Sequence, residues 1–377
     1  MVVKKQQQRA GDSSQQFQAE QMNFVMGIDE KRAREIIDEK LEETIKKYSL
    51  ESQEIAKKRI QLFANELIPK LVKNSLLDEL KEPSIQMLIL DAQKTAASTE
   101  RLADCSLLSE LLTHRIKNGT DRNIRSSVSQ AVKIVGEISE EALLGLTVVY
   151  AVSALLPSLA LLYQFRLDIS AFNAFFTNVL NGKKLPNGNE WIDNLEILGA
   201  VRISPPFFGT NKFNQVIFEQ LDGYVDVGIL KESKEFNSAK KMLLNAGIPE
   251  CILVDHELRD GYVRLNLVTK KHLRSPSFQV YNEKQEIQYL TEEQITILEK
   301  IYDFYENNDD YKNENIAKFI GDWDSYNSLK QVREWWDNHS VVFYNTAVGD
   351  ILAHTNTQRC EPSLPSRDSL FFTTVVS

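Results

Sequence analysis

Residues 143–165 read LLGLTVVYAVSALLPSLALLYQF, an apolar stretch without a charged side chain. As a helix it would be long enough to cross the roughly 30 Å hydrocarbon layer of a membrane. Pro157 lies near its middle, however, and no cluster of basic residues flanks the stretch to orient a span. Because a proline tends to end or kink a helix at the preceding residue, the pattern favours two buried helices that meet at Leu156 and Pro157.

The composition around this stretch is that of a globular chain with several domains. The chain has 377 residues, of which 42% are hydrophobic and 26% are charged, and a domain typically takes about 150 residues. Only 15 glycines and 10 prolines are present, which favours helices over an all-β or collagen-like architecture. We therefore expect a largely helical, multidomain protein.

Charge and cysteine content exclude several classes of protein. The net charge of -9, from 44 basic and 53 acidic residues, argues against a surface that coats nucleic acid or anionic lipid. Cys105, Cys251 and Cys360 lie far apart, so we expect neither a disulfide framework nor a metal site. Residues 1–16 lack the apolar core of a secretory signal. We expect a cytoplasmic protein without a cofactor, and nucleic acid is not the partner that we expect.

The first 75 residues carry two features of a self-associating segment. Residues 1–27 are polar, and the alternation in Gln16–Ala19 suggests short strands that neighbouring chains would complete; a disordered tail is the alternative. In residues 28–75, Asp29 can cap an amphipathic helix, and apolar residues form a seam between balanced charges. Such a seam suits a helical hairpin or a coiled coil. We expect a homo-oligomer.

The remaining residues divide into four predicted regions. These are a helical core at 76–182, a small α/β unit at 183–280, a winged-helix-like unit at 285–359 and a tail at 360–377. In the α/β unit, residues 224–230 alternate as a strand, and residues 251–268 form a hairpin that turns at Asp260–Gly261, with Glu257 opposite Arg264. The predicted fold class is mainly α, a multidomain helical protein with a small α/β insert and a winged-helix-like C-terminal unit.

The clearest charged feature is the segment HRIKNGTDRNIR, residues 114–125, at a predicted corner between two helices. Its cations Arg115, Lys117, Arg122 and Arg125 lie around a helix start that Asp121 can cap. Free backbone N–H groups at such a start also favour anions. The corner could bind a phosphate or a carboxylate-bearing partner, but a solvated corner between two helices is the commoner outcome for such a pattern. The winged-helix-like unit is acidic instead, so we expect it to pack on the rest of the chain or to dock a protein, and not to bind phosphate.

Candidates for catalysis are weak. The sequence contains no GxxxxGK[ST], GxGxxG, HExxH, GxSxG or EF-hand motif. Glu110 and His114 are four residues apart on a helix and can touch, but such pairs are usually surface contacts. Asp222, Glu232 and Lys234 could hold magnesium and orient water, as in nucleases of the PD-(D/E)xK type. Acid-x-lysine triplets of this kind also arise by chance in a chain with many charges.

Two further histidine arrangements point to structure rather than chemistry. Cys105 and His114 are nine residues apart, which places them on opposite faces of one helix and excludes a catalytic dyad. His256 stands between Asp255 and Glu257, but strand alternation directs it to the apolar side. We expect His256 to be a hydrogen-bonded core histidine.

Three stretches together resemble a family of bacterial proteins of uncharacterised function, known mainly by locus tags. They are AGDSSQQFQAEQMNFVMGIDEKRAREI, STERLADCSLLSELLTHRIKNGTDRNIRSSVSQA and TAVGDILAHTNTQRCEPSLP. The opening AGDxS element, with QA further on, is similar to a module that precedes unrelated bacterial domains, some linked to phage defence, where it is thought to assemble chains through short strands. Glu20 stands where such repeats usually have a second glycine. The family supplies no catalytic residues.

These observations together predict a non-enzymatic assembly and recognition protein that oligomerises and contacts a protein partner. A role in phage defence or stress response is what the resemblance implies. Two alternatives remain open at this point. One is a metal-dependent nuclease or other hydrolase, and the second is a membrane-acting effector that inserts residues 143–165.

Overall fold

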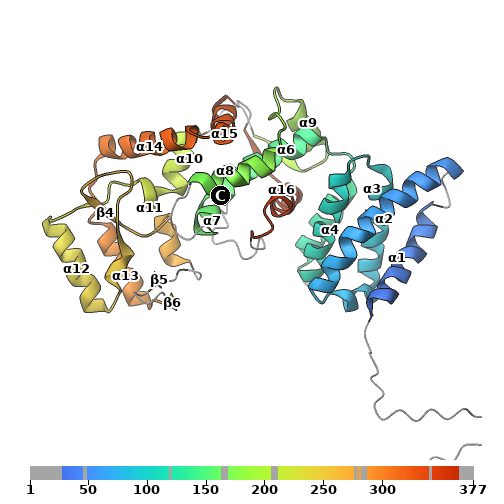
Figure 1. The fold of residues 1–377 in the computed structure, drawn as a ribbon, viewed down its shortest axis with the longest axis horizontal. Helices are drawn as coiled ribbons and strands as arrows, with labels where there is room; N and C mark the ends of the chain where they lie inside the picture. The colour runs from blue at the N-terminus through green and yellow to red at the C-terminus, as the bar shows by residue number, and fades with distance from the viewer. Residues whose placement is uncertain are drawn as a thin grey trace, which may run out of the picture.

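The structure, a computed structural model, describes residues 28–364 apart from short segments. Those segments are 46–48, 119–120, 163–168, 205–210, 276–277, 279, 282–286 and 339–341. Residues 1–27, for which strand-mediated assembly is predicted, and residues 365–377 of the predicted tail also lie outside the described residues. Helices dominate and a few short strands join them, which confirms the predicted mainly α fold class (Figure 1).

The N-terminal helices pack into one array. They are α1 (Glu30–Ile45), α2 (Leu50–Lys73), α3 (Pro83–Ser98), α4 (Leu102–Lys117) and α5 (Arg122–Ile134), with a 3₁₀ turn at Leu77–Lys81. The predicted cap at Asp29 is present, because its carboxylate accepts a 2.7 Å hydrogen bond from the backbone N–H of Arg32. Helix α1 therefore begins where its sequence indicates.

The described part of the apolar seam predicted for residues 28–75 is mostly buried inside this array. Ala33 and Ile37 of α1 share one core with Phe63 of α2. The side-chain amide of Gln93, in α3, donates a 2.9 Å hydrogen bond to the Ile37 carbonyl. Helices α1 and α2 pack against each other within the chain, as in the helical hairpin that the seam allows.

The uncharged stretch follows one helical path through α6 (Glu140–Tyr150), a π-helical turn (Ala151–Leu155) and α7 (Leu156–Leu162). By length and hydropathy the segment Glu140–Leu161 could cross a membrane, yet 83% of its most apolar window is buried inside the protein. The stretch is part of the core, as predicted. The break expected before the proline is a π-helical turn rather than a separation into two helices.

The π-helical turn accommodates Pro157, which has no N–H to donate to the carbonyls one turn before it. A side chain from another helix takes that role. Gln220 ends α10 (Phe213–Gln220), and its Nε2 lies 2.9 Å from the carbonyl oxygens of both Val152 and Ser153. The amide thus ties α10 to the long apolar helix.

Replacing Gln220 by leucine should lower the free energy of unfolding by about 1–3 kcal/mol, because two carbonyl groups lose their donor. Pro157→Ala restores a backbone N–H, so Gln220→Leu should cost less in that background, with a coupling above about 0.5 kcal/mol. Urea unfolding of the wild type, both single variants and the double variant measures this coupling. Strict additivity would show that the amide does not replace the missing donor of the proline.

The middle of the molecule packs around aromatic side chains. Its helices are α8 (Ile169–Leu180), α9 (Glu190–Ile197), α10, α14 (Asp309–Asp324) and α15 (Asn327–Asn338). Trp323 is fully buried. Its ring centroid lies 5.0–6.0 Å from those of Phe172, Phe176, Phe213 and Phe319. This cluster joins α8, α10 and α14 into one core with the N-terminal array.

Helix α16 (Ala347–Cys360) runs back to the N-terminal half and packs against α4, α5 and α6. The side-chain amide of Asn356 donates a 2.8 Å hydrogen bond to the hydroxyl of Thr147 in α6. Before α16, strand β7 (Phe343–Asn345) pairs antiparallel with β1 (Val201–Ile203). Segments far apart in the sequence therefore meet at the centre of the molecule (Figure 1).

A second core holds the α/β elements, at the end of the molecule opposite α1 (Figure 1). Helices α12 (Lys234–Ala246) and α13 (Glu292–Tyr302) pack together there. A three-stranded antiparallel sheet has the order β2-β4-β3, and β5 pairs with β6. The strands are β2 (Ile229–Leu230), β3 (Leu253–Asp255), β4 (Tyr262–Leu265), β5 (Val280–Tyr281) and β6 (Ile287–Gln288).

The strand predicted over residues 224–230 is only partly correct. Asp222–Val225 forms a helical turn, α11, and only Ile229–Leu230 pairs as a strand. Local hydrogen bonds decide this outcome, because the N–H of Asp226 reaches the carbonyl of Asp222 at 2.9 Å.

The hairpin register is also wrong, although its two strands exist. Arg264 lies opposite Val254 rather than Glu257. The N–H of His256 donates a 3.0 Å hydrogen bond to the carbonyl of Tyr262, so a longer loop replaces the predicted two-residue turn. Glu257 leaves the strand in this loop, but its carboxylate still pairs with Arg264 at 3.0 Å.

The structure does not confirm a winged-helix unit within residues 285–359. Helix α13 belongs to the second core with α12, whereas α14 and α15 pack against α10, and α15 also packs against α8. The strand that would form the wing, β7, pairs with β1 instead of a neighbouring hairpin strand. The helices predicted to form one winged-helix unit are therefore divided between the two cores.

Candidate functional site

The basic corner, defined as Arg115, Lys117, Arg122 and Arg125, lies where α4 ends and α5 begins. Arg115 and Lys117 are in the last turn of α4, and Arg122 is the first residue of α5. The Asp121 carboxylate caps α5, as predicted. The structure thus places the four predicted cations on two adjoining helix ends that pack against each other.

Arg115 has an unusual environment for a cation. Only 5% of it is exposed, yet its side chain has no ion pair or hydrogen bond within the described residues. Burial lowers the pKa of Arg115, and the charge of Arg125 lowers it further, while Glu82 opposes both effects. Arg115 and Arg125 thus lie on helices that pack together, their charges repel each other, and neither has a bound carboxylate among the described residues.

The other three cations of the corner are also unpaired in the part of the chain that the structure describes. Lys117 and Arg122 are exposed, and Arg125 is half-buried. Lys117 lies in the last turn of α4, and Arg122 and Arg125 lie in the first turn of α5. Their charges add to the local positive potential.

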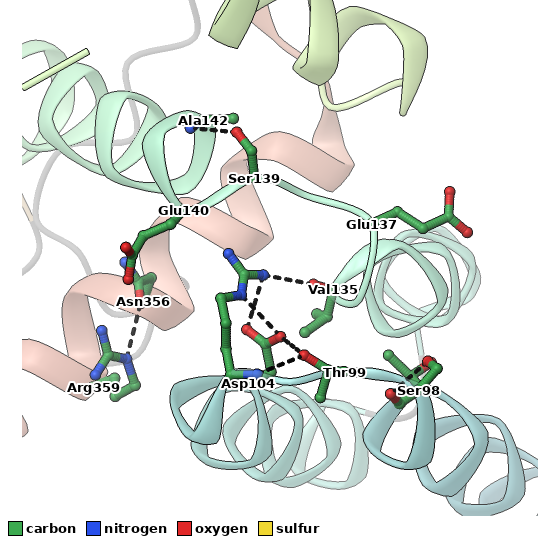
Figure 2. A network of polar contacts seen from close by, with 12 residues as sticks. Ser98, Thr99, Asp104, Val135, Glu137, Ser139, Glu140, Ala142, Asn356 and Arg359 are labelled. Carbon is green, nitrogen blue, oxygen red and sulfur yellow. Dashed lines mark hydrogen bonds and ion pairs between the residues drawn. The ribbon is translucent and has the colours of Figure 1, made fainter. Parts of the chain in front are cut away.

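The opposite end of α4 provides a contrast. Arg101 holds Asp104 with two bonds, Nε to Oδ2 at 3.1 Å and Nη2 to Oδ1 at 3.0 Å, and also reaches the Val135 carbonyl at 2.9 Å. Thr99 donates a short hydrogen bond to the same carboxylate. Figure 2 shows this network at the junction of α3, α4 and α5. Asp104 is 1% exposed. The buried charge at the start of α4 therefore has a counter-ion, whereas Arg115 at the end of α4 has none within the described residues.

The helix N-terminus adds less to the site than we predicted. The Asp121 carboxylate accepts hydrogen bonds from Asn123 N at 2.7 Å and Ile124 N at 3.4 Å. The N–H of Arg125 bonds to the Asp121 carbonyl at 3.0 Å. Because these groups are occupied, an anion would be bound by side chains of the corner rather than by the backbone of the first turn.

The predicted Glu110 and His114 pair has other partners. Glu110 binds Lys70 of α2 at 2.7 Å, and His114 Nε2 lies 3.1 Å from Asn118 Nδ2. Cys105 is buried, and burial raises the pKa of its thiol to about 11. A thiolate nucleophile is therefore disfavoured at neutral pH.

The nuclease candidates Asp222, Glu232 and Lys234 have different surroundings. Asp222 begins α11, accepts a 3.2 Å hydrogen bond from Lys270 N, and has a pKa raised mainly by burial. Glu232 and Lys234 are exposed near the start of α12. No group of three or more His, Cys, Asp or Glu side chains suited to a metal ion occurs among the described residues.

His256 is the core histidine that its strand position predicted. It is 4% exposed, and its Nε2 lies 2.7 Å from the Asp226 carbonyl. Burial lowers its pKa. The sequence did not reveal the neighbouring polar cluster, in which the Asp226 carboxylate pairs with Lys312 and accepts a 2.6 Å hydrogen bond from the Tyr302 hydroxyl. These residues are too far apart in the sequence for spacing to indicate their contact, and they join the two cores.

Comparison with known proteins gives one match. The model of a family known by locus tags, whose members are uncharacterised, matches residues 27–365. The match does not include the AGDxS element near the N-terminus. No curated protein and no solved structure matches the chain.

Proposed function

Because the chain belongs to this family of uncharacterised, locus-tag-named proteins, we propose its function from its own geometry. We propose a non-enzymatic assembly and recognition protein that binds an anionic partner at the basic corner. One observation carries the proposal: in a chain of net charge -9, four cations lie on two adjoining helix ends without a carboxylate partner within the described residues.

Several other arginines of the structure are paired with carboxylates. Arg34 pairs with Glu30 at 2.7 Å, Arg274 with Glu299 at 2.5 Å, and Arg333 with Asp324 at 2.7 Å. Acidic side chains are therefore abundant enough to neutralise arginines elsewhere on the surface. A local positive site on an acidic protein attracts and orients an anionic partner.

The assembly part of the proposal rests on residues 1–27, because the described part of the seam at residues 28–75 is mostly covered within the chain. Strands too short to be stable alone would be completed by neighbouring copies. Light scattering should give an oligomer for the intact protein and a smaller particle for a Δ1–27 variant. A monomer in both samples would end this part of the proposal. The cytoplasmic location and the role in phage defence or stress response stay predictions.

Recognition can be tested with two anionic probes at constant ionic strength, a triglutamate peptide and inorganic phosphate. We expect at least one probe to raise the melting temperature of the wild type, because a ligand that binds only the native state stabilises it. The double variant Arg115→Gln/Arg125→Gln should not respond. Lys133→Gln is the matched control, since Lys133 is exposed on α5 outside the corner. If neither probe acts on the wild type, the corner is not a recognition site.

A further inference from the structure

We propose that the basic corner binds a phosphate monoester in its dianionic form, held between the guanidinium groups of Arg115 and Arg125. The inference rests on the proposed function and names the chemical group that the partner presents. It starts from one juxtaposition: Arg115, buried and without a partner among the described residues, is in the last turn of α4, and Arg125 is in the first turn of α5, the helix that packs against α4.

Arg115 is prepared for an external anion. Its neighbours in α4, Leu111 and Leu112, are fully buried, and Arg115 itself is 5% exposed. Its guanidinium nitrogen atoms, which have no partner among the described residues, are nevertheless not fully enclosed, so the group keeps some contact with solvent. A buried charge without a counter-ion destabilises the fold. An anion that binds there would remove that cost, and a planar fork held in place loses little side-chain entropy on binding.

The charge of the corner selects a dianion over a carboxylate. Two adjacent guanidinium groups repel each other, and one carboxylate can neutralise only one of them. A phosphate monoester carries about -1.5 to -2 charges at pH 7 and offers three acceptor oxygens. Both arginines can therefore bind it with charge-assisted hydrogen bonds, while the exposed Lys117 and Arg122 add attraction at longer range.

A single phosphate group fits the corner better than a nucleic acid backbone. Duplex DNA presents one charge about every 1.7 Å of its axis, so proteins that bind it need an extended basic surface. Here two acidic residues reduce the positive charge of the corner. Glu82 acts on Arg115 from the start of α3, and the exposed Asp121 caps α5. The rest of the ester would extend into solvent.

Titration calorimetry with inorganic phosphate at pH 8 tests the proposal, with acetate at equal ionic strength for comparison. We expect phosphate to bind the wild type and acetate not to bind. Arg115→Met and Arg125→Gln should each weaken phosphate binding at least tenfold, which corresponds to the loss of a charge-assisted hydrogen bond. Lys133→Gln should bind phosphate like the wild type. No phosphate binding, equal binding of acetate, or unchanged binding by both arginine variants would overturn the proposal.

A second measurement separates a binding role of Arg115 from a structural one. Without phosphate, Arg115→Met should melt at the wild-type temperature or above it, because an apolar side chain of similar length replaces an uncompensated buried charge. With phosphate, the wild type should gain stability and the variant should not. A variant that melts lower than the wild type without phosphate, and gains as much from phosphate, would show that Arg115 serves packing only.

The source of the phosphate is distinguished by two further probes, O-phosphoserine and a phosphoserine peptide. Tighter binding of the peptide than of inorganic phosphate supports the site and points to a phosphorylated protein. Equal or weaker binding of both supports the site and points to free phosphate or a small ester. A response to triglutamate without a response to any phosphate probe sinks this inference, but leaves the proposed recognition of an anionic partner intact.

Discussion

Gly349→Ala is expected to lower the free energy of unfolding by about 3 kcal/mol, the upper end of the usual cost of overpacking. Gly349 lies in the first turn of α16, where Thr346 N and Thr346 Oγ1 both donate to the Ala200 carbonyl, at 2.9 and 3.0 Å. A Cβ at position 349 would overlap the Ala200 carbonyl oxygen and lie 3.0 Å from its carbon. Backbone atoms cannot move aside as a flexible side chain can, so α16 would shift away from the segment that precedes β1.

Gly321→Ala is the matched control for this prediction. Gly321 lies inside α14, and a Cβ there would meet nothing within 4 Å. Alanine is favoured over glycine in a helix interior by roughly 0.5–1 kcal/mol, so this variant should be more stable than the wild type. Urea unfolding followed by circular dichroism compares the two. A loss of stability below about 1 kcal/mol in Gly349→Ala would contradict the close approach of α16 to Ala200.

Asp104→Ala is expected to cost about 3 kcal/mol, because removing one partner of a buried ion pair leaves the other uncompensated. Arg101 would lose both of its bonds to the carboxylate, and Thr99 would lose its acceptor. The side chain of Arg101 is 24% exposed, so water would recover part of the loss, which places the expected cost at the low end of the usual range. Burial also raises the pKa of Asp104, against the opposing effects of Thr99 and Arg101.

Glu30→Ala serves as the control for Asp104→Ala. Glu30 pairs with Arg34 one turn along α1, and both side chains are about half exposed, at 54% and 46%. Such a surface pair contributes at most about 0.5 kcal/mol. Thermal unfolding should therefore separate the two variants clearly. Equal effects would mean that the Asp104 network contributes no more than a solvated pair.

The helical part of the fold could be predicted largely because its information is local. The cap at Asp121, the helix that begins at Arg122 and the buried apolar stretch all follow from spacing within one helix. The hairpin register could not be predicted in this way. It depends on a loop that Arg259 anchors to α14 through the Tyr311 carbonyl at 2.9 Å, and contacts over this sequence distance leave no periodic pattern.

The candidate site was predicted in its residues but not in its main property. The sequence showed a charged corner, whereas the structure shows that one of its four cations is buried. A signal for this was present, because Leu108, Leu111 and Arg115 follow one another at helical spacing on one face of α4. A cation that continues an apolar stripe is a candidate for a buried charge. That Arg115 has no partner among the described residues could be known only from the packing of α4 against α5.

The position of α16 has a consequence for how the molecule is made. Helices α1 to α5 can meet as soon as they leave the ribosome, since their contacts join neighbours in the sequence. The faces of α4, α5 and α6 that receive α16 stay uncovered until residues 347–360 have been synthesised. During that interval an apolar surface is open to chaperones and to other nascent chains, so truncation before residue 347 should promote aggregation.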